Sequence, residues 1–141
     1  MSTKYKDRLL NLIIINNVKK EVIELEAIWY GGGYHFKLVD DKKGFAQTVH
    51  TNVEPYNIED NKIVYFWSKV EELDVWNWKK KYPYWKQKGE AVTDGCRWTL
   101  KLRDRKGREK YCSGYMSFPR RYKDLIEELN NLFSSDIYPY V

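Results

Sequence analysis

The segment between Cys96 and Gly114 constrains the fold of this chain most tightly, because two alternating runs of residues flank a tight turn. In the turn sequence Asp104-Arg105-Lys106-Gly107, Asp suits the first position of a type I turn and Gly suits the left-handed position that follows it. The resulting three-residue loop sets the register of a hairpin. The predicted pairs are Arg103 with Glu109, Lys101 with Tyr111, Leu100 with Cys112, and Trp98 with Gly114.

The two faces of this hairpin differ in character. The inward face is apolar and is expected to join the core, with Trp98, Leu100, Leu102 and Cys112. The outward face is cationic and solvated, with Arg97, Lys101 and Arg103. A slip of one residue would exchange the two faces, so the alternation and the turn support the same pairing.

Three further strands are predicted before the hairpin. Residues 22–30 alternate in part and end at three consecutive glycines. Residues 34–38 alternate cleanly, and residues 45–51 follow a polar turn. These three strands are expected to form a meander, which together with the hairpin makes an antiparallel sheet of about five strands.

Other segments have the apolar spacing of helices. Residues 57–73 favour a helix, although their middle is also rich in strand-forming residues. Pro119 suits the first position of a second helix, whose apolar stripe continues to about Phe133. A third helix is predicted over residues 4–16, where a strand is the alternative. We therefore expect a single α+β domain over residues 1–141, with two or three helices packed on one face of the sheet.

Charge is distributed unevenly along the chain. The segment from Trp76 to Lys123 contains fifteen Lys and Arg residues against four Asp and Glu residues, a formal charge of +11, whereas both flanking segments are acidic. Ten aromatic residues lie in the same segment. A cationic surface rich in aromatic side chains suits an acidic partner, which is either a protein surface or a nucleic acid.

Two clusters of cations stand out within that segment. Lys79-Lys80-Lys81 lies among Trp and Tyr residues, which suits phosphates and stacked bases, although such lysines more often solvate the edge of a core. Arg120 and Arg121 are placed in the first turn of the final helix, where free backbone N–H groups favour anions, unless acidic residues of the same helix pair with them. The candidate anion-contacting residues are Lys79, Lys80, Lys81, Arg97, Lys101, Arg103, Arg105, Arg108, Arg120 and Arg121.

Catalytic and metal-binding patterns are weak. His35 and His50 lie in no recognisable catalytic motif, and His35 falls on an alternating strand. These histidines with Cys96 and Cys112 have the right chemistry for zinc but not a known spacing. The cysteines form no CxxC pair and are expected to be reduced and packed as small apolar side chains. We expect no catalytic residue, no metal and no cofactor.

The C-terminal half resembles a known sequence layout. Its run from Asp94 to Leu102, Asp-Gly-Cys-Arg-Trp-Thr-Leu-Lys-Leu, is followed by Gly107, Gly114, Pro119 and an apolar helix. This order is similar to that of small uncharacterised proteins of low-GC Gram-positive bacteria and their mobile elements, over about the last 65 residues. The resemblance implies a shared fold. Because that group carries no established activity, the resemblance transfers no catalytic residue.

These observations favour a non-enzymatic binding protein of the inhibitor or immunity type, of the kind that phages carry against host defences. It would dock a basic, aromatic-rich surface on an acidic protein target. The alternative is a nucleic-acid-binding accessory protein that uses the same residues on phosphates. The apolar run from Leu9 to Ile15 is too short to span a bilayer and no signal-peptide pattern is present, so we expect a cytoplasmic protein with no membrane partner.

Overall fold

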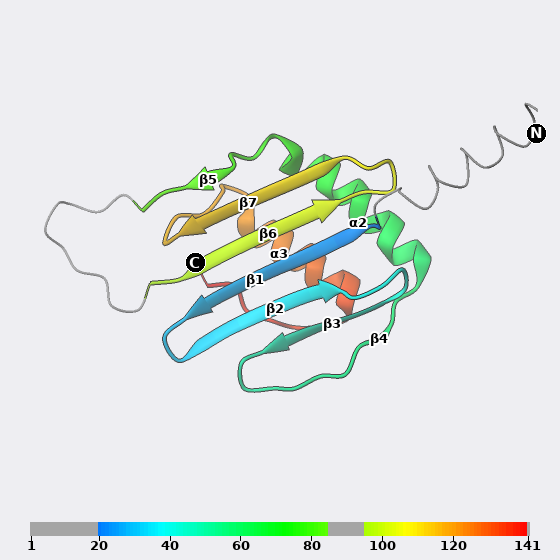
Figure 1. Ribbon diagram of the computed structural model, residues 1–141, viewed down its shortest axis with the longest axis horizontal. Helices are drawn as coiled ribbons and strands as arrows, with labels where there is room; N and C mark the ends of the chain where they lie inside the picture. Colours follow the sequence, from blue (N-terminus) through cyan, green and yellow to red (C-terminus); the bar gives the residue numbers. More distant parts are fainter. Residues whose placement is uncertain (1–19, 85–94, 141) are drawn as a thin grey trace, which may run out of the picture.

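The computed structural model describes residues 20–84 and 95–140, which form an α+β fold. Seven strands make one mixed sheet in the order β4-β3-β2-β1-β6-β7-β5 (Figure 1). Their bounds are β1 Val22–Trp29, β2 Gly32–Leu38, β3 Lys43–Thr48, β4 Tyr56–Asn57, β5 Lys81–Tyr82, β6 Arg97–Arg103 and β7 Glu109–Tyr115. The expected meander is β1-β2-β3, and the expected hairpin is β6-β7.

The prediction of an antiparallel sheet of about five strands was wrong in the number of strands and in the direction of one of them. The structure adds β4 and β5 at the two edges, and β5 runs parallel to β7. Each added strand has only two residues, too few to show an alternating pattern. Such strands are recruited by a neighbouring strand's free backbone groups, which the local sequence does not reveal. The helix expected over residues 4–16 lies outside the described residues.

Two helices cover one face of the sheet. Helix α2 spans Asp60–Glu72 and α3 spans Tyr122–Phe133, and a short 3₁₀ turn, η1, spans Val75–Asn77. Both helices lie behind the sheet in Figure 1, with α3 crossing the central strands. The expected helices at 57–73 and from Pro119 to Phe133 are confirmed, with somewhat later starts.

The hairpin has the expected turn and register. Gly107 has φ +88°, the left-handed conformation that the turn requires. The Asp104 carboxylate accepts hydrogen bonds from the backbone N–H groups of Lys106 and Arg108, which holds the loop closed. The four predicted cross-strand pairs are all present.

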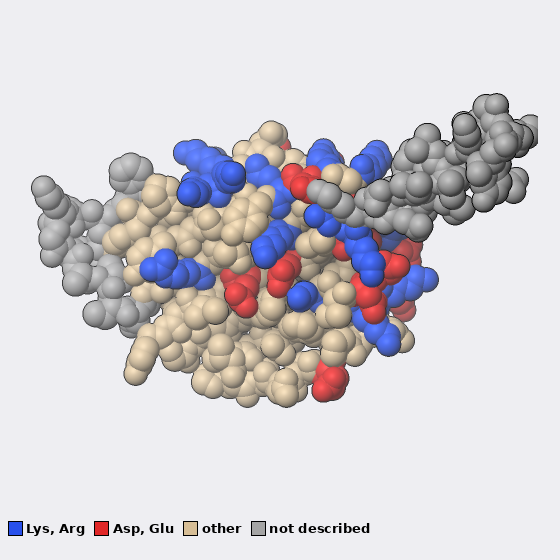
Figure 2. All heavy atoms as spheres, in the orientation of Figure 1, with Lys and Arg blue, Asp and Glu red and all other residues tan. Residues whose placement is uncertain are grey.

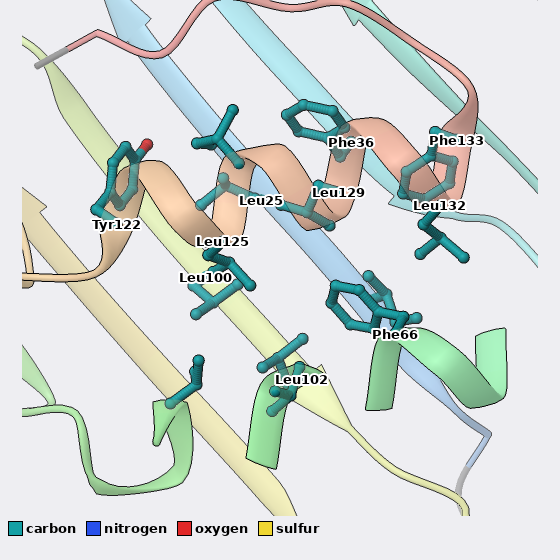
Figure 3. Close-up of a cluster of buried hydrophobic side chains, with 14 of the residues drawn as sticks. Leu25, Phe36, Phe66, Leu100, Leu102, Tyr122, Leu125, Leu129, Leu132 and Phe133 are labelled. Carbon is teal, nitrogen blue, oxygen red and sulfur yellow. The ribbon is translucent and has the colours of Figure 1, made fainter. Parts of the chain in front are cut away.

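The core lies between the sheet and the two helices. All six residues of the predicted α3 stripe are buried: Tyr122, Leu125, Ile126, Leu129, Leu132 and Phe133. Figure 3 shows Leu125 and Leu129 of α3 lying over Leu25 and Leu100 of the sheet. The inward hairpin residues are buried as expected, and both cysteines are free and buried.

Candidate anion-binding surface

The sheet face opposite the helices carries the polar side chains of the strands. Because side chains alternate across a strand, burial of Trp98, Leu100 and Leu102 against the helices turns the intervening residues outward. The outward residues of β6 and β7 are Arg97, Thr99, Lys101, Arg103, Glu109, Tyr111, Ser113 and Tyr115. In Figure 2, Lys and Arg side chains gather over the β5, β6 and β7 side of this face, and few cover the β2–β3 side.

We call the outward side chains of β6 and β7 around this region, together with Lys80 and Lys81 at the adjoining β5 edge, the basic half-face. Its members are Lys80, Lys81, Arg97, Thr99, Lys101, Tyr111, Ser113 and Tyr115. Lys81 joins it because β5 aligns Lys81 with Ser113 on the outer edge of β7. The backbone carbonyl of Lys80 accepts a hydrogen bond from the Ser113 N–H at 3.0 Å, which holds the lysine run against the hairpin.

Each end of the hairpin face presents a cation beside a tyrosine ring. Arg97 faces Tyr115 across the strands, and its guanidinium carbon lies 4.6 Å from the centre of that ring. Lys101 faces Tyr111, with its Nζ 6.0 Å from the ring centre. Such contacts stabilise the position of a cation on an exposed surface without removing its charge.

Between these two pairs the surface is hollow. At this level the facing residues are Thr99 and Ser113, whose side chains are small. The hollow, which we call the Ser113 hollow, has a volume of about 380 Å³. Its lining residues are Lys81, Tyr82, Pro83, Arg97, Trp98, Thr99, Tyr111, Ser113, Gly114 and Tyr115, so no described carboxylate lines it. A neighbouring hollow beyond Tyr111 is lined by Lys80 and Lys101 but also by Glu109.

Four of the ten candidate cations meet on the basic half-face: Lys80, Lys81, Arg97 and Lys101. Lys79 lies just before β5, where its backbone N–H donates to the Tyr82 hydroxyl. The four cations are exposed, and none of them forms an ion pair with another residue in the described ranges 20–84 and 95–140. They come from two stretches of chain that are about 20 residues apart in sequence. No carboxylate of the described residues therefore neutralises their positive charges.

Three other candidates on the hairpin are neutralised within the protein. The Nε of Arg103 donates to Glu109 at 2.8 Å. Arg105 pairs with Glu21 and Asp60. The pKa of Asp60 is lowered because its carboxylate accepts hydrogen bonds from the Arg105 guanidinium. The remaining member, Arg108, pairs with Asp104 and Glu71. The predicted register already set Arg103 opposite Glu109. Sequence alone could not exclude Arg105 and Arg108, because Glu21, Asp60 and Glu71 come from other segments of the chain.

Arg120 and Arg121 lie just before the final helix and not in its first turn, where they were predicted. The helix begins only at Tyr122, whose N–H bonds the Pro119 carbonyl in a turn, so both arginines precede the first helical turn. Arg121 pairs with Asp124 at 2.8 Å. Arg120 makes no ion pair within the described residues, but it leads into a helix on the opposite side of the sheet.

The strand next to the hairpin limits the width of the basic region. On β1, Glu24 faces Lys101 and Glu26 faces Thr99. His35 on β2 contacts both carboxylates, with Nε2 2.7 Å from Glu24 and Nδ1 3.6 Å from Glu26. The open face therefore has a cationic half beside an acidic stripe, and His35 is engaged by its neighbours.

The remaining reactive side chains are also engaged or buried. His50 lies at hydrogen-bonding distance, 3.2 Å, from the Gly31 carbonyl. Burial raises the pKa of Cys96 to about 11 and also raises the pKa of Cys112, so both are protonated thiols at neutral pH. Within residues 20–84 and 95–140, no group of three or more His, Cys, Asp and Glu side chains is placed to hold a metal ion.

Sequence reasoning missed Thr99, Ser113 and Tyr115 as members of the surface. The predicted register already placed all three on the outward face, so this signal was present. Nothing in the sequence indicated that Lys81 would align beside Ser113, because that contact depends on a parallel strand from a distant segment.

Gly95 shapes one end of the basic half-face, which leads to a prediction. A Cβ added at Gly95 would lie 2.6 Å from Cε2 and Oη of Tyr115, so Gly95→Ala must displace that ring. We expect the Arg97 stack to be lost and the free energy of unfolding to fall by about 0.5–1 kcal/mol. Urea denaturation and the ring-current shifts of Arg97 would measure this. An equal destabilisation in an Arg97→Ala background would show that the stack is not the cause.

A scan against protein-family models and searches of curated proteins and of solved structures found no match to this chain. No helix in the described ranges is both long enough and apolar enough to cross a membrane.

Proposed function

We propose that this protein is a non-enzymatic binding protein that docks its basic half-face on an acidic surface of a partner protein, as inhibitors and immunity proteins do. The observation that carries the proposal is the convergence of four cations without ion pairs in the described structure on one side of an open sheet. Tyr and Arg side chains, which are enriched in protein interfaces, lie among them.

The charge pattern favours a protein partner over an extended nucleic-acid strand. Adjacent strands lie about 4.8 Å apart, so the stripe of Glu24 and Glu26 is one strand away from Lys101 and Thr99. A phosphate backbone that crossed the open face would meet these carboxylates. A compact acidic patch of a folded protein can cover the cationic half alone, and its own cations can face the stripe.

Charge reversal on the half-face is the direct test. The triple variant Lys81→Glu, Arg97→Glu, Lys101→Glu should lose the partners that the wild-type protein captures from a host lysate. With a purified partner, affinity should fall at least about a hundredfold, because like charges then face each other across the interface. Calorimetric titration at two salt concentrations measures the change, and wild-type binding should weaken at the higher one.

A charge-matched variant separates this surface from net charge. Lys106→Glu, Arg120→Glu, Lys123→Glu makes the same change in net charge on exposed side chains outside the half-face. We expect it to bind as wild type does. An equal loss of partner binding in both triple variants would contradict the proposal. Unchanged capture of the partner by both variants would contradict it as well.

Single-stranded nucleic acid is the second candidate, favoured by the two tyrosines on the half-face. Tyr111 is 47% exposed and stands beside Lys101, an arrangement on which a base can stack. The test is binding of single-stranded DNA or RNA at several salt concentrations. If the logarithm of the affinity falls linearly with the logarithm of the salt concentration, and if Tyr111→Ala abolishes binding, nucleic acid replaces protein as the proposed partner.

A further inference from the structure

We infer that the Ser113 hollow is an oxyanion subsite, which receives a phosphate monoester carried on a side chain of the partner protein. This inference rests on the proposed function, because it assigns the chemistry that the partner places at the centre of the basic half-face. It goes beyond charge attraction, since it requires a particular set of hydrogen-bond donors around one point.

The lining of the hollow is rich in donors. Lys81 stands on its outer edge and Arg97 at one end, and the hydroxyl-bearing residues Thr99 and Ser113 face each other between them. Neither hydroxyl has a hydrogen-bond partner among the residues that the structure describes, although both side chains are partly buried. Partly buried hydroxyls without partners beside two cations are suited to bind the oxygens of an anion.

Arg97 is held in a position from which it can bind two oxygens. Its guanidinium carbon lies over the Tyr115 ring, 4.6 Å from the ring centre, and this contact occupies none of its N–H donors. The N–H groups lie along its edge and make no hydrogen bond within the described residues. A guanidinium held over a ring keeps its donors for a bidentate contact with phosphate or carboxylate, and less side-chain entropy is lost when the contact forms.

The number of donors favours phosphate over carboxylate. A phosphate monoester offers three oxygens and carries about −1.5 to −2 charges at pH 7. Two cations and two hydroxyls match that charge and those oxygens better than a carboxylate, which has two oxygens and one charge. The hollow, at about 380 Å³, also leaves room for the group that carries the phosphate, beside Tyr111 and Tyr115.

The tested probe is phenyl phosphate, with benzoate as the carboxylate comparison. Each is titrated into the full-length ¹⁵N-labelled protein while backbone amide shifts are followed. We expect saturable shifts centred on Thr99 and Ser113 with phenyl phosphate, and at least about tenfold weaker binding of benzoate. Phenyl phosphate should also bind more tightly at pH 7.5 than at pH 5.5, because its second ionisation falls near pH 6, whereas benzoate should show no such gain.

Two variants localise the binding. Arg97→Gln should weaken phenyl phosphate at least about tenfold, whereas Arg120→Gln, which removes the same charge elsewhere, should have little effect. Thr99→Val with Ser113→Ala keeps every charge and should weaken phenyl phosphate about three- to tenfold. Unchanged amide spectra outside the hollow establish that each variant is folded.

The results separate this inference from the proposed function. Three results would overturn the phosphate subsite, even if charge reversal still abolished capture of the partner. They are amide shifts spread over all lysines, an equal loss of phenyl phosphate affinity in Arg97→Gln and Arg120→Gln, and binding of benzoate as tight as that of phenyl phosphate. Tighter binding of a 5′-phosphorylated oligonucleotide than of a matched phosphopeptide would also overturn it, because the phosphate would then belong to nucleic acid.

Discussion

Replacing Trp98 with alanine is expected to lower the free energy of unfolding by about 3–5 kcal/mol, the range for large aromatic truncations in a core. The Trp98 side chain is only 1% exposed. Its ring contacts those of Tyr82, Phe118 and Tyr122, and its Nε1 donates to the Ser117 carbonyl at 2.8 Å. The substitution therefore leaves a cavity where the hairpin, β5 and α3 meet, and it also removes a hydrogen bond.

Urea denaturation followed by circular dichroism measures this effect. Tyr111→Ala is the matched control, because Tyr111 is an aromatic residue of the same hairpin on the open face, and it should cost less than about 1 kcal/mol. A Trp98→Ala protein that unfolds cooperatively with a midpoint close to wild type would show that Trp98 does not anchor the core.

The second large effect is expected at alkaline pH and arises from two buried tyrosines. The hydroxyls of Tyr34 and Tyr122 lie 2.6 Å apart in a hydrogen bond between β2 and α3. Burial raises the pKa of Tyr34 to about 12 and raises the pKa of Tyr122 as well. The unfolded chain releases these protons near pH 10, whereas the folded protein retains them.

Stability should therefore fall as pH rises above 10, by about 1.4 kcal/mol per pH unit for each tyrosine while the folded protein remains protonated. Urea denaturation at pH 8, 10 and 11 measures the decline. The double variant Tyr34→Phe with Tyr122→Phe removes both ionising groups and keeps the ring shapes, so it should be close to wild type at pH 8 and decline less above pH 10. Identical declines in the two proteins would assign the loss of stability to other groups.

The local sequence predicted the hairpin and helix α3, because the residues of each element show its characteristic pattern. The Asp104 to Gly107 turn determined the hairpin register, because the loop geometry leaves only one pairing that buries Trp98 and Leu100 together. The stripe of α3 was predicted for a similar reason, since a helix that covers a sheet must be apolar along one side. The two-residue strands at the sheet edges lacked any such signal.

The candidate site was predicted in part. The outward cations Arg97 and Lys101 follow from the hairpin pattern. Arg103, Arg105 and Arg108 share that hairpin, yet each is paired with a carboxylate, and the partners Glu21, Asp60 and Glu71 lie far away in sequence. A count of charges along the chain cannot separate these paired arginines from unpaired ones.

The sequence by itself determined the α+β class, the hairpin with its two faces, and the excess of cations in one segment, because turn chemistry and alternation act over a few neighbouring residues. Only the tertiary structure decided which cations stay unpaired, and that Lys81 stands beside Ser113 next to Arg97. Those arrangements depend on contacts between segments distant in the chain, such as the parallel pairing of β5 with β7. Their energies arise only when the whole sheet and its helices have assembled.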